Sequence, residues 1–174
     1  TVFGGRYTSM LNTELRAKSG LTYGASASFE RLQQPGAFSI RSFTATETTV
    51  PALDLALATL DRLHADGLDA TQLESARSYL LGQFPPTIET NGTLASRLAE
   101  MMLYGLGRDD VDQFAARVRA VDAAAARAAL ESAFPASADL AIVLVGDAAR
   151  IRGDVRKYGP VTEMKITDTR FRPQ

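Results

Sequence analysis

The chain has 174 residues, of which 45% are hydrophobic, and 19 basic against 20 acidic side chains leave a formal net charge of −1. The composition is ordinary for a soluble globular domain, and the balanced charge argues against nucleic acid, whose binding needs a basic face. Cysteine is absent and histidine occurs once, at His64, which excludes disulfides and thiol catalysis and leaves too few ligands for a catalytic zinc. The longest dense apolar run, residues 140–145, is far too short to span a membrane. We therefore expect a soluble protein, located in either the cytoplasm or the periplasm.

The N-terminal part predicts a helix followed by an antiparallel hairpin. Within residues 3–18 the apolar side chains fall at helical spacing, a basic last turn precedes Gly20, and a tight Gly-Gly turn forms the entry. Residues 21–32 and 37–46 then alternate between apolar and polar side chains. The Gln-Gln-Pro-Gly sequence at residues 33–36 has the composition of a turn, so the two alternating runs are predicted to pair as strands.

Helices dominate the middle of the sequence. A stripe of leucines predicts one helix from Pro51 to Gly67. Residues 71–74 fit a capping box, which predicts that a second helix starts there and ends at the prolines after Phe84. A third follows a cap at Asn91, and two shorter helices are predicted within the remaining stretch. These last three cover residues 94–103, 111–121 and 122–134, the final one capped by Asp122.

The C-terminal part predicts a buried strand, a short helix and a last strand. Residues 140–145 are apolar on both faces, which is typical of a central strand covered by helices. A helix over residues 148–157 precedes an alternating run in which Met164 and Ile166 share a face. The sum is an α+β fold, a two-layer sandwich with helices on one face of a small, mainly antiparallel sheet, and residues 1–174 are expected to form a single domain.

Isolated functional motifs have simpler structural explanations. Asn91-Gly92-Thr93 matches a glycosylation acceptor, but a helix cap explains the same residues. His64 lies on the polar side of its helix without a second metal-type residue beside it, so a surface histidine is favoured over a ligand.

One segment carries a more specific signal. Residues 4–23 combine a Gly-Gly turn, Ser9-Met10-Leu11, Leu15-Arg16-Ala17-Lys18 and Gly20-Leu21-Thr22-Tyr23 in the sequence GGRYTSMLNTELRAKSGLTY. This pattern resembles the opening of the C-terminal domains in the pitrilysin/insulinase family of zinc metallopeptidases. The likeness continues through residues 71–77 and 143–146 in the same order, so it covers most of the chain.

The resemblance implies a division of labour between domains. The family's zinc is held by an inverted His-x-x-Glu-His helix in a separate N-terminal domain, and no such motif occurs here. The chain is therefore expected to be a non-metal, substrate-binding domain of a zinc metalloendopeptidase or of its silent partner subunit, inactive alone and without a cofactor of its own. Its implied partners are the zinc-bearing domain or a homologous subunit, and a peptide. The family's first strand and helix would be missing before the Gly-Gly turn, leaving an open sheet edge for self-association.

The family's non-metal half also supplies an arginine and a tyrosine, seven positions apart, that reach the substrate. Arg16 and Tyr23 match that pair and are predicted to bind substrate. Two structural alternatives stay open: Arg16 can complement a helix C-terminus, and Tyr23 can be a core residue with its hydroxyl at the rim. At the level of function, the alternatives are a non-enzymatic structural core subunit or scaffold of the same fold, and a peptide-binding module that offers its sheet edge.

Overall fold

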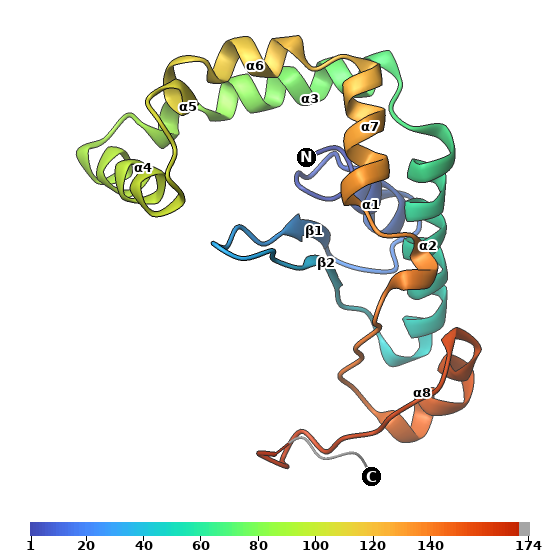
Figure 1. The fold of residues 1–174 in the computed structure, drawn as a ribbon. Coiled ribbons are helices and arrows are strands. Elements are labelled where there is room, and N and C mark those ends of the chain that lie inside the picture. The colour runs from blue at the N-terminus through green and yellow to red at the C-terminus, as the bar shows by residue number, and fades with distance from the viewer. Residues whose placement is uncertain (171–174) are drawn as a thin grey trace.

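A computed structural model describes residues 1–170 as a small two-stranded sheet surrounded by helices (Figure 1). The elements in chain order are α1 (Met10–Asn12), a π-helical turn (Thr13–Lys18), β1 (Ala25–Phe29), β2 (Phe38–Ser42), α2 (Thr49–Asp66), α3 (Ala70–Gln83), α4 (Asn91–Tyr104), α5 (Asp109–Asp112), α6 (Phe114–Ala120), α7 (Ala123–Ala133) and α8 (Ala148–Val155). Short 3₁₀ turns connect several of them. None of the helices within the described range is long and apolar enough to cross a membrane.

The core lies between the hairpin and the helices α1, α2 and α7. β1 and β2 pair antiparallel, in a register that runs from Ala25 opposite Ser42 to Phe29 opposite Phe38. Alternate side chains of a strand point to the same side of a sheet, so each strand contributes every second residue to the face that packs on the helices. The buried cluster consists of Phe3, Leu11, Leu15, Ala25, Ala56, Leu60, Leu63 and Leu130. This arrangement confirms the predicted α+β fold with helices on one face of an antiparallel sheet.

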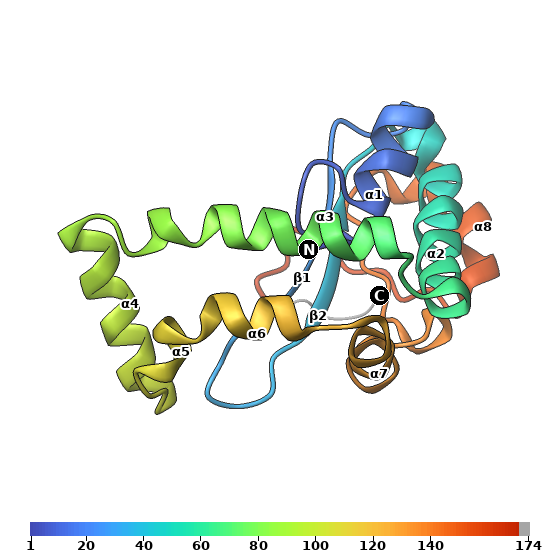
Figure 2. The same cartoon turned by 90° about the horizontal axis from the view of Figure 1, so that it is seen from above.

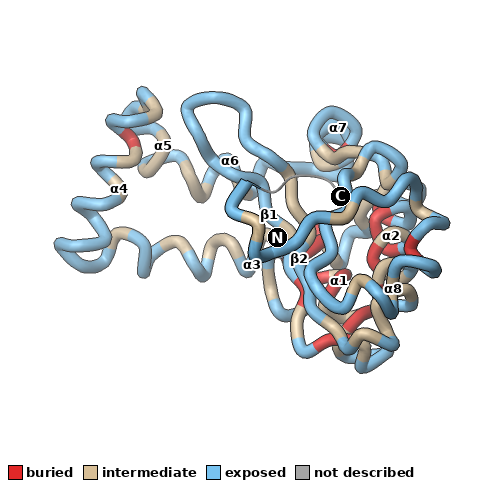
Figure 3. The backbone as a smooth tube through the Cα atoms, turned by 90° about the horizontal axis from the view of Figure 1, so that it is seen from below, coloured by how far each residue is buried: buried red, intermediate tan, exposed pale blue. Residues whose placement is uncertain are grey.

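An arm of helices extends away from this core. α3 and α6 pack side by side, and α4 lies across the far end of the pair (Figures 1 and 2). Most of the arm is exposed or half-buried, whereas the buried residues gather near α1 and α2 (Figure 3). The hairpin loop reaches the arm, because the Tyr104 hydroxyl donates to the Arg31 carbonyl at 2.6 Å and the Gln33 amide donates to the Leu103 carbonyl at 3.2 Å.

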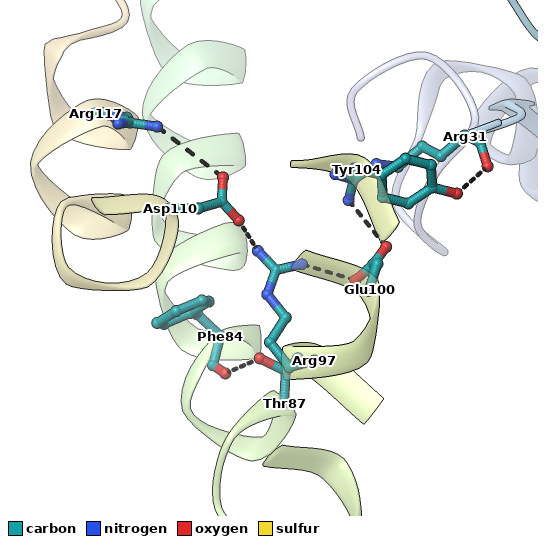
Figure 4. A network of polar contacts seen from close by, with 8 residues as sticks. All are labelled: Arg31, Phe84, Thr87, Arg97, Glu100, Tyr104, Asp110 and Arg117. Carbon is teal, nitrogen blue, oxygen red and sulfur yellow. Dashed lines mark hydrogen bonds and ion pairs between the residues drawn. The ribbon is translucent and has the colours of Figure 1, made fainter. Parts of the chain in front are cut away.

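Ion pairs hold the tip of the arm together. The Arg97 guanidinium bonds the Glu100 carboxylate at 2.9 Å and also the Asp110 carboxylate, so it joins α4 to α5 (Figure 4). The Arg31 guanidinium of the hairpin loop lies 3.4 Å from the Glu100 carboxylate, and the Arg117 guanidinium of α6 lies 4.0 Å from the Asp110 carboxylate. Because five charged groups from four segments take part, this network fixes the tip more firmly than an isolated surface pair would.

Helix ends depart from the predictions by one to several residues. Asp69 rather than Thr71 caps α3. The Asp69 carboxylate accepts a hydrogen bond from the Gln72 backbone N–H at 2.7 Å, and the Gln72 side-chain oxygen accepts one from the Asp69 backbone N–H. α4 is capped by Thr90 instead of Asn91, although the cap of α7 at Asp122 is confirmed. In both corrected cases, a suitable polar residue one or two positions earlier forms the cap. The predicted first helix begins only at Met10, because residues 2–8 form turns.

The two strands predicted in the C-terminal part do not form. Residues 140–145 run without a ladder partner, as do residues 160–165, and β1 and β2 are the strands found within residues 1–170. A strand needs a neighbour for its hydrogen bonds, and a cavity of about 470 Å³ separates residues 140–144 from β2 above helix α2. Val143 and Val145 are consequently 84% and 81% exposed, although their sequence is that of a core strand.

Candidate functional site

Arg16 and Tyr23 lie together at the end of the first helix. The Arg16 guanidinium carbon lies over the Tyr23 ring, 4.3 Å from its centroid, and also over the Tyr7 ring at 5.0 Å. Both tyrosines are exposed, Tyr23 by 74% and Tyr7 by 66%. The structure therefore brings the two predicted residues into contact and adds a third, and we call these three residues the Arg16 cluster.

A π-helical turn carries Arg16. The Ser19 amide donates to the Glu14 carbonyl at 3.2 Å, five residues back, so this turn is wider than an α-helical one. Leu11 and Leu15 are fully buried and anchor the inner side of the segment. Arg16 directly follows Leu15 and is half-buried. Single π-helical turns are rare and frequently occur at functional sites, and the sequence pattern, which predicts an ordinary helix here, does not reveal this one.

A network of hydroxyl groups fixes the turn that carries Tyr23. Gly20 adopts a left-handed conformation, with φ +66°, and ends the helix. The Thr44 hydroxyl then donates to the Leu21 carbonyl at 2.6 Å, and the buried Thr22 hydroxyl donates to the Gly24 carbonyl at 2.9 Å. Because Thr22 points inward, its neighbour Tyr23 points outward. The alternative that Tyr23 is a core residue does not fit this placement.

Glu14, two residues before Arg16 in the chain, pairs with two cations. Glu14 accepts hydrogen bonds from Lys18 at 3.0 Å and from Arg62 of α2 at 2.9 Å. The bond from Lys18, together with that from Arg62, holds the pKa of the Glu14 carboxyl below its ordinary value. Arg16 makes no ion pair and no side-chain hydrogen bond with residues 1–170, so its N–H donors are available to a ligand.

Glu14 links the π-helical turn to α2, and its replacement by glutamine should cost stability in a pH-dependent way. A carboxyl whose pKa is lowered in the folded state stabilises the protein above its ordinary pKa of 4.5, and this stabilisation is lost as the pH falls through the folded value. We expect Glu14→Gln to lower the free energy of unfolding by roughly 0.5–1 kcal/mol at pH 7, with the difference from wild type vanishing in acid. Urea unfolding between pH 3 and pH 7 measures this.

The matched control is Glu131→Gln, because Glu131 pairs with Arg127 on the exposed surface of α7. Its effect should be near zero at every pH. Equal curves for the two variants would contradict the tethering role of Glu14.

The cluster can donate hydrogen bonds to an acceptor that carries or gains negative charge. A guanidinium offers several N–H donors in one plane, and a tyrosine hydroxyl adds another. A peptide carbonyl that becomes an oxyanion is stabilised by such preorganised donors. The aromatic rings restrict Arg16 without neutralising it, because a cation–π contact leaves the edge of the guanidinium free.

The described part of the chain holds no group of side chains that could bind a zinc ion. No group of three or more His, Cys, Asp or Glu side chains with the spacing of a metal site occurs within residues 1–170. His64, expected on the surface, is half-buried, and its Nε2 lies 3.0 Å from the Pro135 carbonyl. A contact with a carbonyl occupies this nitrogen, so the sole histidine is structural in this fold.

Tyr7 is the residue of the cluster that sequence analysis misses. It lies in the loop before α1, where no periodicity relates it to Arg16. A signal was nevertheless present, because the loop opens on two glycines and then presents an aromatic side chain without an apolar neighbour. Exposed aromatic residues in an ordered loop deserve consideration as binding residues.

Comparisons with known proteins find similar folds. Residues 1–80 match a family model described as the peptidase M16 inactive domain. The solved structure of the peptidase M16 inactive domain from Pseudomonas fluorescens is similar, with a TM-score of 0.71 and 24% identity over 78% of this chain and 32% of that one. A protease from Helicobacter pylori gives a TM-score of 0.66 and 15% identity over 78% of this chain and 33% of that one.

A third structure is of more similar length. It is a candidate zinc protease from Bordetella pertussis Tohama I, with a TM-score of 0.60 and 23% identity over 75% of this chain and 71% of that one. Curated protein sequences give no match. The chain thus spans about a third of the length of the Pseudomonas and Helicobacter chains. The match over residues 1–80 is consistent with the C-terminal, non-metal domain of the pitrilysin/insulinase family that the sequence pattern resembles.

Proposed function

We propose that this chain is the substrate-binding domain of a zinc-dependent endopeptidase and that Arg16 and Tyr23 hold the peptide. The observation that carries the proposal is the contact of the half-buried Arg16 side chain with the exposed ring of Tyr23, with the Arg16 donors free of partners among residues 1–170. Arg16 would bind a peptide carbonyl, and Tyr23 would donate to the same oxygen as charge develops on it.

Zinc belongs to another part of the enzyme in this proposal. The side chains of residues 1–170 form no group that fits the metal, so a zinc-bearing N-terminal domain or a homologous partner subunit would hold it. Residues 1–174 would form one domain of that enzyme. The Arg16 cluster would face the partner across the peptide. The partner would contribute the zinc, and this chain would contribute the hydrogen-bond donors of Arg16 and Tyr23.

Reconstitution tests this division of labour. The purified chain is added to the zinc-bearing partner, and cleavage of an unfolded or short peptide is followed as a function of the chain's concentration. We expect saturable activation, because binding energy from this domain orients the peptide. If the partner alone cleaves the peptide as fast as the mixture does, the substrate-binding role fails and the non-enzymatic scaffold becomes the better account.

The free edge of the sheet offers a place for such a partner. β2 pairs only with β1 among residues 1–170, and residues 140–145 have no backbone partner across the cavity of about 470 Å³. Helix α2 forms the floor of this cavity. We infer that an extended segment of the partner, or of a second copy, pairs along this edge, because unpaired strand edges recruit other strands.

The purified chain should therefore associate with itself as its concentration rises. Sedimentation velocity over a wide concentration range measures this. Val143→Lys is expected to weaken the association, because Val143 lines the cavity beside the β2 edge and a lysine there opposes strand pairing. The matched control is Met102→Lys, since Met102 is 83% exposed on α4, away from the edge. A monomer at all concentrations, or equal effects of the two lysines, would contradict the pairing.

A further inference from the structure

Tyr7 shares the Arg16 guanidinium with Tyr23, although the three residues come from different local structures. Tyr7 lies in the loop before α1, Arg16 in the π-helical turn, and Tyr23 in the turn before β1. The guanidinium carbon lies 5.0 Å from the Tyr7 ring centroid and 4.3 Å from that of Tyr23. An arginine side chain is long and flexible, so contact with two rings restricts it far more than contact with one.

The backbone of the Tyr7 loop is held at several points. The Gly4 carbonyl accepts from the Ala27 amide of β1 at 3.0 Å. Arg6 reaches across to α3, where its guanidinium donates to the Ser75 carbonyl at 2.9 Å and to the Ser75 hydroxyl at 3.0 Å. The Arg6 carbonyl in turn accepts from the Asn12 side chain at 3.3 Å.

This rigid support does not serve to bury Tyr7, which is 66% exposed. The hydroxyl of Tyr7 has no hydrogen-bond partner within residues 1–170. The contact with Arg16 is thus what the ring contributes to the structure. Its face, and not its hydroxyl, makes that contact.

We propose that Tyr7 is a positioning residue that orients Arg16 toward the bound peptide. This inference rests on the proposed function, since it assigns Tyr7 a role in the same site. Tyr7 acts through Arg16 and does not touch the reacting carbonyl. An aromatic ring at position 7 is therefore required, and phenylalanine is sufficient there, whereas Tyr23 requires its hydroxyl.

The first measurement concerns the contact itself and needs no activity. In the NMR spectrum of the purified protein, the Nε–Hε signal of Arg16 should be displaced by the ring currents of both tyrosines. Tyr7→Leu should move this signal toward the position seen for free arginine, and Tyr7→Phe should leave it near its wild-type position. An unmoved signal in Tyr7→Leu overturns the inference.

The second measurement concerns the peptide, in the enzyme assembled with its zinc-bearing partner. Tyr7→Leu should raise KM and lower kcat, each by no more than about two- to fivefold, the range that an exposed cation–π contact contributes, because Tyr7 acts through Arg16. Tyr7→Phe should restore the wild-type KM. The control is Tyr104→Leu. This variant removes a tyrosine of the arm whose ring centroid lies 5.6 Å from the guanidinium carbon of another arginine, Arg31.

The outcomes separate the inference from the proposed function. An effect of Arg16→Ala without an effect of Tyr7→Leu overturns the inference and leaves the proposed function standing. If neither variant changes KM or kcat while the NMR signal moves, the contact is real but both the positioning role and the proposed function fail. Equal losses in Tyr7→Leu and Tyr104→Leu, accompanied by lower melting temperatures, would assign the effect to stability and also overturn the inference.

Discussion

Replacing Tyr23 with phenylalanine is expected to lower kcat of the assembled enzyme by about 10²-fold, the effect of losing one donor to an oxyanion. The hydroxyl is the group removed, and it has no hydrogen-bond partner within residues 1–170. Since Tyr23 is 74% exposed, folding should be unaffected and the melting curve should match that of wild type. Steady-state kinetics with a peptide substrate, alongside thermal unfolding, measures both quantities.

The chain offers a matched control for this prediction. Tyr7→Phe makes the same chemical change in the same cluster, and it should leave kcat near wild type because Tyr7 contributes its ring and not its hydroxyl. Arg16→Ala should affect kcat and KM together, since the guanidinium both anchors the peptide and donates to its carbonyl. Wild-type turnover in both Tyr23→Phe and Arg16→Ala would remove the catalytic contribution and favour a structural scaffold.

Gly4→Ala should be the most damaging small substitution in the first segment. A Cβ at Gly4 would lie 2.3 Å from the Ala27 backbone nitrogen and 2.6 Å from the Ala27 Cβ. The chain would have to move away from β1 and lengthen the bond from the Ala27 amide to the Gly4 carbonyl. We expect a loss of roughly 2–3 kcal/mol, as for overpacking in a core, and a fall in melting temperature of about 2–4 °C per kcal/mol.

Gly24→Ala provides the comparison, because a Cβ at Gly24 would meet no atom within 4 Å and the residue has no positive φ. Its melting temperature should stay within the error of wild type. A Gly4→Ala variant as stable as Gly24→Ala would show that the entry loop is not held against β1. In that case the fixed backbone assigned to the Tyr7 loop would be wrong as well.

Local signals in the sequence were enough to predict the hairpin and most helices. Alternation, the turn at residues 33–36 and the leucine stripe from Leu53 to Leu63 act within one element, so one sequence suffices to recognise them. The strand predicted at residues 140–145 fails for the opposite reason. Its apolar composition suits a sheet interior, but strand formation depends on a neighbour that residues 1–170 do not provide.

The same distinction applies to the candidate site. Arg16 and Tyr23 were found because a family pattern places them seven residues apart, and the structure brings them into contact. Tyr7 belongs to a loop whose path depends on Gly4 approaching β1 and on Arg6 reaching α3. Contacts of this kind join segments far apart in sequence, and periodicity cannot reveal them.

The unequal burial of the core and the arm means that the molecule need not unfold as one unit. Helix α2 has five buried residues, whereas α4 has Met101 alone and α6 has none. Elements with few buried apolar contacts open at lower free energy than the core does. The arm is tied to the hairpin loop through the exposed Arg31 and Gln33 and the half-buried Tyr104. A partly open species, with α4 released from the hairpin loop while α3 keeps its contact with Arg6 and the Arg16 cluster stays formed, is therefore the first excursion from the native state. Amide exchange in α4 would then outpace that in α2.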